Sequence, residues 1–561
     1  MDESTAAGGA RAAPVEMESR TPDKAGLVLA SLILVAAVAN LNLSVANVAL
    51  PSIGASFDSS QTALDLIAVG YSLGLAASVL WFGALGDRYG RKMMIVIGMV
   101  LSLPASIVAA YAPSDTVLFG ARVVGGLSAG MAYPTTLAMI TALWAGPPRT
   151  KSIALWSALG GGFAMLGPLI SGFLLQAFPG AWGYVFLITL PLALVALYVA
   201  WRYVPAHVSE TTEPVDNIGG VLSALMVGSF IIALNFVAVP NLQAIAIGLF
   251  VVAAAALLLF VMRQRRAKNP LYDLHVAARR TFWVAACAGV IVFGSLMGIA
   301  FINQQYLQNV LGYSTLAAGG AILPVVAFMV LVAPRSAKPV ESRGSRSTLL
   351  LGQSVLGLAF IGMLLLWKEG TPYWQVAIPL SLMGIGVGLA GTPSSNSLTG
   401  SVPVTRVGMA SGTADLQRDL GGALMTSVFG ALLTAGYASA MGTAIAQSGQ
   451  DVTSTTQSML QLSYSSAEHM AAQYPQYAQQ ITAAAKSAFL AGDQWAYIAG
   501  LIAVLIGGAL TFFLFPKHQQ ELEMRQRFLA EDVQQPRGEQ PARPEREEAG
   551  RRFPQAPHPA R

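Results

Sequence analysis

The sequence predicts an all-α membrane protein that crosses the bilayer about fourteen times, and three observations lead to this prediction. Hydrophobic residues make up 54% of the 561 positions and charged residues only 11%, whereas a soluble globular domain carries about 25% charged residues. Apolar runs of about 20 residues, the length that an α-helix needs to cross the hydrocarbon core, recur along most of the chain. Lysines and arginines fall almost entirely in alternate loops between these runs, which is typical of a multi-pass protein.

The predicted spans follow a polar N-terminus of about 25 residues, which is mixed in charge and which we expect to be disordered. This segment lacks the apolar core and cleavage site of a signal peptide. The spans begin near Leu27, Thr62, Met93, Val117, Ser152, Gly183, Ile218, Ala244, Phe282, Leu316, Thr348, Tyr373, Val407 and Gln494. Of the 33 lysines and arginines, only Lys368 and Lys486 fall in loops that this count places outside. Both termini are therefore predicted to be cytoplasmic.

Two polar stretches lie outside the predicted spans. Residues 440–493 are expected to form one long external loop, which is either a solvated connector or a cap over a substrate path. Residues 517–561 are dense in Arg, Glu, Gln and Pro. We expect this cytoplasmic tail to be disordered after at most a short amphipathic helix at 522–529.

Arg122 interrupts the apolar run 117–143 in a chain that otherwise keeps charges out of its hydrophobic segments. A guanidinium in hydrocarbon costs roughly 2.5 to 3.5 kcal/mol even on the lenient insertion scale. Its side chain must therefore face the protein interior or an aqueous pathway. A purely structural arginine, paired with a carbonyl or a neighbouring span, is the alternative.

Acidic residues are scarce in the predicted spans, which contain no Glu, and all five histidines lie in loops or tails. Asp415 and Asp419 are four residues apart and so share one helix face, with Arg418 within reach of Asp415. Two carboxylates beside one arginine differ in proton affinity, which a coupling site requires. The proposed proton-coupling residues are thus Arg122, Asp415, Arg418 and Asp419. The alternative is that Asp415, Arg418 and Asp419, which we call the triad, lie in a solvated first turn of their helix.

Amide and aromatic side chains are the other polar groups inside the spans. A single buried amide usually holds neighbouring helices together, but collectively such groups suit an amphiphilic solute. The candidate substrate-binding residues are Asn40, Asn42, Asn303, Gln304, Tyr306 and Asn396.

The loop after the second span carries glycines and charges in a characteristic order, at Gly83, Asp87, Arg88, Gly90, Arg91 and Lys92. This segment resembles the cytoplasmic motif of the major facilitator superfamily. Gly90 permits a tight reversal, Asp87 can pair with a helix N-terminus or an arginine, and the cations hold the loop inside. A basic turn that only fixes the topology is the alternative.

Two further segments are similar to motifs of the same superfamily. The segment from Arg122 to Pro134 looks like its fourth-span motif, in which the arginine is associated with substrate or proton coupling. The segment around Gly167 and Pro168 is similar to its antiporter motif, although Phe163 and Ser171 stand where glycines are usual. Gly167 and Pro168 would bend the helix and shape the interface at which the halves move.

The number of spans resembles the fourteen-span drug:proton antiporters of this superfamily. That resemblance implies two six-helix bundles, at 26–204 and 282–516, with an extra helix pair at 216–263 and a basic cytoplasmic loop at 264–281. The branch commonly has an acidic residue in span one where Asn42 stands here. An amide cannot exchange a proton near neutral pH, so another group must carry it.

We therefore expect a secondary transporter in the cytoplasmic cell membrane that exports a hydrophobic or amphiphilic, drug-like molecule by alternating access, in exchange for protons. Its partners would be the substrate, protons and the lipid bilayer. Neither a cofactor or metal nor a nucleic acid is expected, and the protein should be a monomer. A proton-independent facilitator or uptake carrier is the main alternative, and a non-transporting sensor or scaffold is a second. A membrane-bound enzyme is not expected, because no histidine lies within a catalytic motif.

Overall fold

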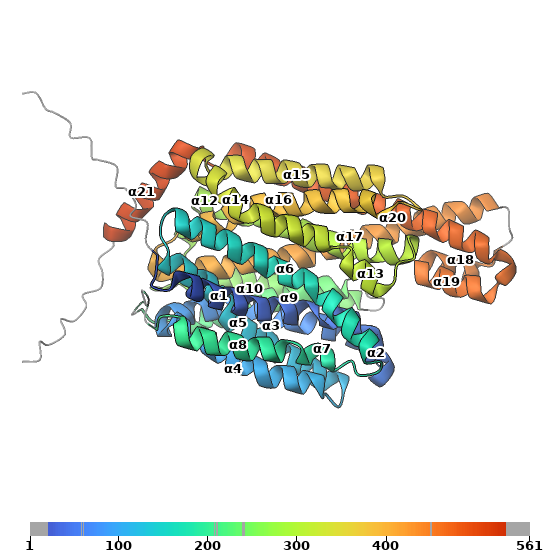
Figure 1. The fold of residues 1–561 in the computed structure, drawn as a ribbon, viewed down its shortest axis with the longest axis horizontal. Helices are drawn as coiled ribbons and strands as arrows, with labels where there is room; N and C mark the ends of the chain where they lie inside the picture. The colour runs from blue at the N-terminus through green and yellow to red at the C-terminus, as the bar shows by residue number, and fades with distance from the viewer. Residues whose placement is uncertain are drawn as a thin grey trace, which may run out of the picture.

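The chain folds into a long bundle of α-helices (Figure 1). The computed structural model describes residues 21–534, except 58, 60, 207, 209, 210, 212, 238–241 and 449–451. The described part contains no strand, and fourteen of its helical segments are long and apolar enough to cross a membrane. The predicted fold class and number of spans are confirmed. The predictions for the first 20 residues and for 535–561 lie outside the described residues.

The first half of the chain forms six spans, two of which are broken into shorter helices. Its helices are α1 (Ala25–Ser44), α2 (Ala46–Phe57), α3 (Gln61–Tyr89), α4 (Arg91–Ala110), α5 (Asp115–Leu143), α6 (Pro147–Ala177), α7 (Tyr184–Leu187) and α8 (Thr189–Tyr203). Two helices of the expected extra pair follow, α9 (Asn217–Phe236) and α10 (Gln243–Arg266). They pack on each other, and α9 packs on α3.

The second half has six more spans and ends in a short helix. Its elements are α11 (Leu274–Ala277), α12 (Arg280–Gln305), the π-helix η1 (Tyr306–Val310), α13 (Thr315–Gly320), α14 (Leu323–Arg343), α15 (Ser345–Leu366), α16 (Tyr373–Gly400), η2 (Val404–Arg406), α17 (Val407–Ser448), α18 (Ser454–Leu462), α19 (Tyr464–Gln473), η3 (Pro475–Tyr477), α20 (Ala478–Leu514) and α21 (His518–Gln534). Helix α21 lies at one end of the bundle and α18 with α19 at the other (Figure 1). We call these the α21 end and the α18–α19 end.

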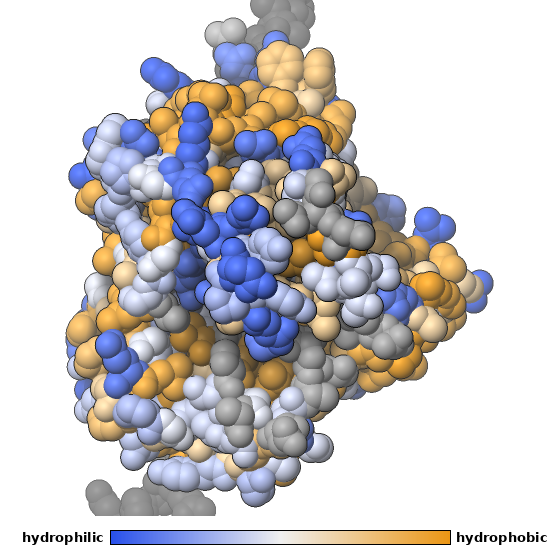
Figure 2. Space-filling view, turned by 90° about the vertical axis from the view of Figure 1, so that its right-hand side faces the viewer, coloured by the Kyte–Doolittle hydropathy of each residue, from blue (hydrophilic) through white to orange (hydrophobic). Residues whose placement is uncertain are grey.

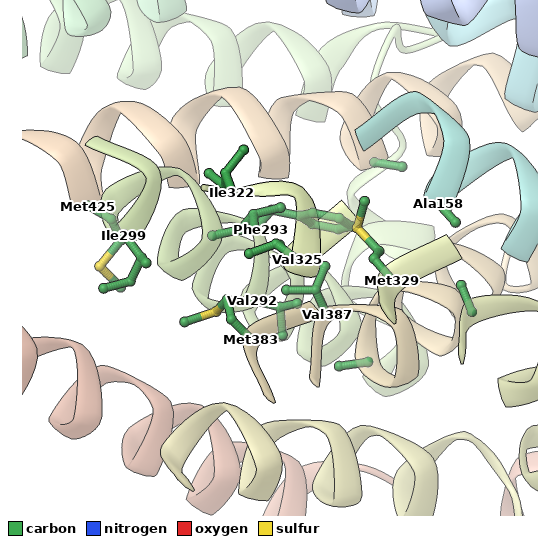
Figure 3. Close-up of a cluster of buried hydrophobic side chains, with 14 of the residues drawn as sticks. Ala158, Val292, Phe293, Ile299, Ile322, Val325, Met329, Met383, Val387 and Met425 are labelled. Carbon is green, nitrogen blue, oxygen red and sulfur yellow. The ribbon is translucent and has the colours of Figure 1, made fainter. Parts of the chain in front are cut away.

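The two halves meet along two seams, α3 against α17 and α6 against α14. Apolar side chains fill the interior beside the second seam. Figure 3 shows Phe293 of α12, Val325 and Met329 of α14 and Val387 of α16 in one buried cluster, to which Ala158 of α6 also belongs. Large apolar side chains also cover the outer surface, for example Leu258 and Phe513. Such exposure is expected of helices that face lipid rather than water.

Glycines allow α3 and α5 to touch backbone to backbone. A Cβ atom on Gly74 would lie 2.2 Å from the carbonyl oxygen of Val123, and one on Gly126 would lie 2.1 Å from that of Tyr71. Small residues permit such close approach of membrane helices. The contact holds Tyr71 and Arg122, which lie on these two helices, next to each other.

The segment at 440–493, which the sequence predicts to be a long external loop, is largely helical in the residues that the structure describes. Helix α17 continues to Ser448, α20 already begins at Ala478, and α18 and α19 form a helical pair between them. Thr453 and Ser463 cap these two helices, because each side chain accepts a hydrogen bond from the backbone N–H three residues later. Figure 2 looks onto this end, where hydrophilic side chains cover much of the centre and apolar ones gather toward the flanks.

The tail also begins with more structure than expected. Helix α21 packs across the α21 end, where Glu521 is buried and accepts hydrogen bonds from the backbone N–H (3.0 Å) and hydroxyl (2.7 Å) of Ser345. This carboxylate therefore caps the N-terminus of α15. Phe528 lies 4.0 Å from the guanidinium of Arg279, which attaches the helix to the start of α12. Position 517 is thus not the start of a disordered tail.

Candidate functional site

The charged triad of α17 lies inside the protein, where Asp415 is buried and Arg418 and Asp419 are partly buried. Asp415 is completely buried, and Arg418 Nη1 lies 3.8 Å from its Oδ1 atom. Neither oxygen of Asp415 has a hydrogen-bond partner, and Oδ2 of Asp419 has none either. The structure thus excludes the alternative of a solvated helix turn. Two carboxyl groups therefore lie beside one guanidinium, and their unpaired oxygens can still bind protons or polar ligands.

Arg418 reaches from the second half of the chain into the first. Its guanidinium donates hydrogen bonds to the hydroxyl of Tyr133 on α5 and to Oγ of Ser157 on α6, the latter at 3.0 Å. The rings of Trp156 and Phe293 each lie 4.7 Å from it. A cation between aromatic faces gains about 2 kcal/mol or more when it is shielded from water. Arg418 is therefore a polar link between the halves, deep within the bundle.

The aromatic residues around Arg418 are held by contacts of their own. Trp156 is buried, donates from Nε1 to the Thr136 hydroxyl at 2.8 Å and stacks on Tyr133 at 5.5 Å. A Cβ atom on Gly160 would lie 3.5 Å from Nδ2 of Asn40 and 3.8 Å from the hydroxyl of Tyr133. Gly160 thus leaves room for Asn40 to lie near the Arg418 site. We call Asn40, Tyr133, Trp156, Ser157, Phe293, Asp415, Arg418 and Asp419 the interface site.

Sequence reasoning missed Tyr133, Trp156, Ser157 and Phe293. A buried aromatic residue in a membrane helix is ordinarily part of the packed core, and a single serine is too common to indicate a site. The only available signal was that Tyr133 lies in the same segment as Arg122.

Arg122 is buried in the first half and binds backbone oxygens. Nη1 donates to the carbonyl of Asn42 at 2.5 Å, and Nη2 lies 3.4 Å from that of Leu43. Both carbonyls belong to the last turn of α1, where the helix breaks before α2 and its carbonyls carry partial negative charge. The rings of Tyr71 and Phe186 lie 4.9 and 5.8 Å away. This is the carbonyl-paired arrangement that the sequence left open as an alternative.

A small cavity adjoins Arg122. It has room for about one water molecule and is lined by polar residues such as Asn42 and Ser102 and by apolar ones such as Ala105 and Phe186. Tyr71, whose ring faces Arg122, belongs to α3, and this helix also packs against α17.

The predicted substrate-binding residues do not form one cluster. Asn42 accepts a hydrogen bond from Thr189 at 3.1 Å and donates to the carbonyl of Val38, so its amide is used in packing. Tyr306 donates to the carbonyl of Lys368 at 2.9 Å and stacks on Trp367, which places it near the α18–α19 end of the second half. Asn303 is buried, and neither polar atom of its amide group has a hydrogen-bond partner. Gln304 accepts a hydrogen bond from Gln308, and Asn396 is buried in α16. Of the six, Asn40 is the one that the structure places at the interface site.

Asp87 links the loop motif to the N-terminus of α17. Its Oδ1 accepts from Nε and Nη2 of Arg91 at 3.1 and 2.8 Å, and its Oδ2 accepts from the backbone N–H of Gly408 at 2.7 Å. Arg91 Nη2 also donates to the carbonyl of Val404 at 2.8 Å. Gly90 has a φ of 112°, which permits the reversal between α3 and α4. Asp87 thus pairs with both of the partners that the sequence offered as alternatives, an arginine and a helix N-terminus. We call Asp87, Arg91, Val404 and Gly408 the latch.

The remaining motif residues lie where the halves or broken helices meet. Gly83 packs on Gly408, since a Cβ atom on it would lie 2.7 Å from the Gly408 carbonyl oxygen. Gly167 packs on Ser44 at the break between α1 and α2, one residue before Pro168 of α6. Arg88 lies 5.5 Å from the ring of Tyr89, and Lys92 is half-buried in the first turn of α4.

Comparison with known proteins places these features in a family. A sequence model of the Major Facilitator Superfamily matches residues 32–426. Multidrug efflux pump LfrA of Mycolicibacterium smegmatis is 32% identical over 426 residues, which cover 75% of this chain and 83% of LfrA. Multidrug resistance protein Stp of Mycobacterium tuberculosis is 31% identical over 399 residues, covering 70% of this chain and 73% of Stp. Methyl viologen resistance protein SmvA of Salmonella typhimurium is 28% identical over 436 residues, covering 77% and 87%.

A solved structure agrees on the fold. The crystal structure of the human organic anion transporter MFSD10 (TETRAN) matches with a TM-score of 0.55 and 14% identity, and covers 87% of this chain and 99% of that one. The sequence resemblance noted above is thus confirmed over most of the chain. The chain has fourteen candidate spans, and its loop motif between α3 and α4 packs against the N-terminus of α17. It belongs to the major facilitator superfamily.

Proposed function

We propose that this protein is a secondary active transporter that exports hydrophobic or amphiphilic small molecules across the cytoplasmic membrane in exchange for protons. The observation that carries the proposal is the interface site, where Arg418 of one half is held by groups of the other half beside two carboxyl groups. Similarity to multidrug efflux and resistance proteins supports the class of substrate.

Alternating access follows from the way α17 joins the latch to the interface site. Gly408 in the latch and Asp415 in the triad lie seven residues apart on this helix, or about 10 Å. A movement of α17 that opens the latch must therefore also move Asp415, Arg418 and Asp419 relative to Tyr133 and Ser157. This rigid connection links the charge state of the interface site to the side on which the protein opens.

The arrangement of cations supports cytoplasmic termini. Arg91, Arg149 and Arg279 lie at the α21 end, where they bond to carbonyl or hydroxyl groups of residues 399–404. Lys486 pairs with Glu369 at 3.6 Å, close to Lys368 in the loop after α15 and at the opposite end. Because positively charged loops stay on the cytoplasmic side, we assign the α21 end to the cytoplasm and the α18–α19 end to the outside.

Substrate and proton would compete at the interface site. Trp156 and Phe293 supply flat apolar surfaces, and Asp415 and Asp419 supply groups that gain or lose a proton. An amphiphile that enters between the aromatic rings displaces Arg418 from them. The freed guanidinium then pairs more closely with Asp415 or Asp419, and such a pair favours loss of the proton from the carboxyl group.

A proton-independent facilitator is the second candidate, favoured by Asn42. This amide stands at the span-one position of the acid found in many related antiporters and is bonded to Thr189. If Asp415 and Asp419 of α17 do not exchange protons, Asn42 of span one cannot do so in their place.

A pH gradient tests the proposal. In vesicles containing the purified protein, uptake of methyl viologen or of ethidium should rise when the lumen is made more acidic than the medium. One exchanged proton permits up to about tenfold accumulation per pH unit. Collapse of the gradient by a protonophore should return uptake to the passive level. Saturable uptake that ignores the gradient would contradict the antiport and favour the facilitator.

A further inference from the structure

A second buried carboxyl group, Asp493, lies outside the interface site. It belongs to α20, has 1% of its surface exposed, and neither of its oxygens has a hydrogen-bond partner. The preceding residue packs tightly against α17, since a Cβ atom on Gly492 would lie 2.4 Å from the carbonyl oxygen of Leu433. Because residues 440–493 as a whole are rich in Gln, Ser and Tyr, the sequence predicts that Asp493 lies at the end of a loop.

Other polar atoms near Asp493 are also unpartnered. The Tyr497 hydroxyl, one turn further along α20, is close enough to pair with the Asp493 carboxyl group, but the two groups do not form a well-aligned hydrogen bond. The ring of Trp367 lies 5.6 Å from that of Tyr497, stacks at 5.0 Å on that of Tyr306, and has an unpaired Nε1–H. Asn303, one turn before Tyr306, has two unpaired amide atoms. Several unsatisfied polar groups on three packed helices call for a functional explanation.

No described basic side chain forms a salt bridge with Asp493. The titratable groups facing it are Tyr497 on its own helix and Tyr306 of η1. From α17, Tyr437 packs against Gly492, and its hydroxyl donates to the carbonyls of Leu460 and Ser463. The ion pair of Lys486 with Glu369 lies seven residues earlier along α20, or about 10 Å away. An ionised carboxylate without a partner in such surroundings costs several kcal/mol, so this packing requires the neutral acid.

The helical pair α18–α19 covers the side from which water would reach Asp493. Leu460 of α18 and Ala467 and Met470 of α19 are buried, and Tyr464 of α19 packs edge-on against Phe489 of α20 at 6.0 Å. Phe489 precedes Asp493 by one helical turn. Hydrophilic side chains cover much of this end of the molecule (Figure 2).

We propose that Asp493 is a second proton-binding site, loaded from the α18–α19 end, and that its protonation permits this end to close. When the end opens, water reaches the carboxyl group and it exchanges protons with the outside. When the end closes, the group must carry a proton, because no described cation balances its charge. The unpaired indole N–H of Trp367 is a donor only, which suits a carboxyl group better than a metal cation. This inference rests on the proposed antiport and adds a loading step to it.

Infrared spectroscopy tests the protonation directly. We would compare the carbonyl stretch of neutral carboxylic acids in the purified Asp415→Asn/Asp419→Asn protein with that of the same protein carrying Asp493→Asn, both at pH 7.5. The expected result is the loss of one carboxylic acid band in the triple variant. No loss, or a sodium-dependent rise in thermal stability that only the variants with Asp493 show, would overturn the proposal.

Transport by the single variant Asp493→Asn separates this inference from the proposed function. The amide mimics the neutral acid, so closure should no longer depend on proton loading. Drug export should then lose most of its dependence on the pH at the α18–α19 side, while Asp493→Glu should keep it. If wild type responds to the gradient and Asp493→Asn responds identically, the inference fails alone. If wild type does not respond, the proposed function fails first.

Discussion

Replacement of Arg418 by alanine is expected to abolish drug export almost completely. The substitution removes the guanidinium that bonds to Tyr133 and Ser157, and leaves Asp415 and Asp419 without their cation. Loss of one partner of a buried charge pair costs about 3 to 5 kcal/mol, which corresponds to a decrease of about a hundredfold or more in transport rate if it acts on the transport cycle. Initial rates of substrate uptake into vesicles would measure the decrease.

Three variants separate the role of Arg418 from general damage. Arg418→Lys keeps the charge but loses the planar fork that reaches two hydroxyl groups at once, so it should restore little transport. Arg265→Ala removes an equally charged but exposed side chain of α10 and should transport normally. Arg418→Ala protein that elutes as a folded monomer and still transports within about threefold of wild type would refute the role of the interface site.

Replacement of Asp87 by asparagine is expected to open the α21 end. The carboxylate accepts two hydrogen bonds from Arg91 and one from the N-terminus of α17, and an amide keeps the shape but not the charge. Hydrogen bonds to charged groups contribute about 1.5 to 3 kcal/mol each. Loss of one such contribution shifts the open–closed equilibrium by roughly tenfold to a hundredfold toward the form open at this end.

Spin labels across the latch would measure this shift. Met93 of α4 and Val404 of η2 are exposed residues of the two halves at the α21 end, so a spin label on either side chain would point away from the packed core. With Cys287 replaced by serine, the distance distribution between labels at these two positions should lengthen in Asp87→Asn. Asp115→Asn makes the same chemical change at the start of α5, near the other end, and should leave the distribution unchanged. An unchanged distribution in Asp87→Asn would show that Asp87 does not hold the halves together.

The architecture was predictable because it depends on local properties of the chain. Span length, hydropathy and the placement of lysines and arginines are set by the bilayer and can be counted along the sequence. The contact of Asp87 with a helix N-terminus was predictable in kind, because a carboxylate can bind the unpaired backbone N–H groups there. Its actual partner, Gly408, lies 321 residues away and could not be named.

The interface site was predictable only in its charged part. Asp415, Arg418 and Asp419 are conspicuous because charge in an apolar helix is costly. Tyr133, Trp156 and Phe293 are ordinary core residues until the fold brings them to Arg418. Asp493 was missed for a different reason, since residues 440–493 are rich in Gln, Ser and Tyr and so predict a loop, whereas α20 already begins at Ala478. Average polarity does not reveal which face of α20 is buried.

The most direct test of proton exchange at α17 is the movement of protons driven by drug alone. Vesicles with equal pH on both sides, a trapped pH indicator and an outward gradient of methyl viologen or ethidium would be followed for lumen pH. The wild-type protein should acidify the lumen as drug leaves, and the Asp415→Asn/Asp419→Asn variant should move drug without protons or not at all. Saturable drug efflux by wild type with constant lumen pH, or proton movement that survives both substitutions, would contradict the account.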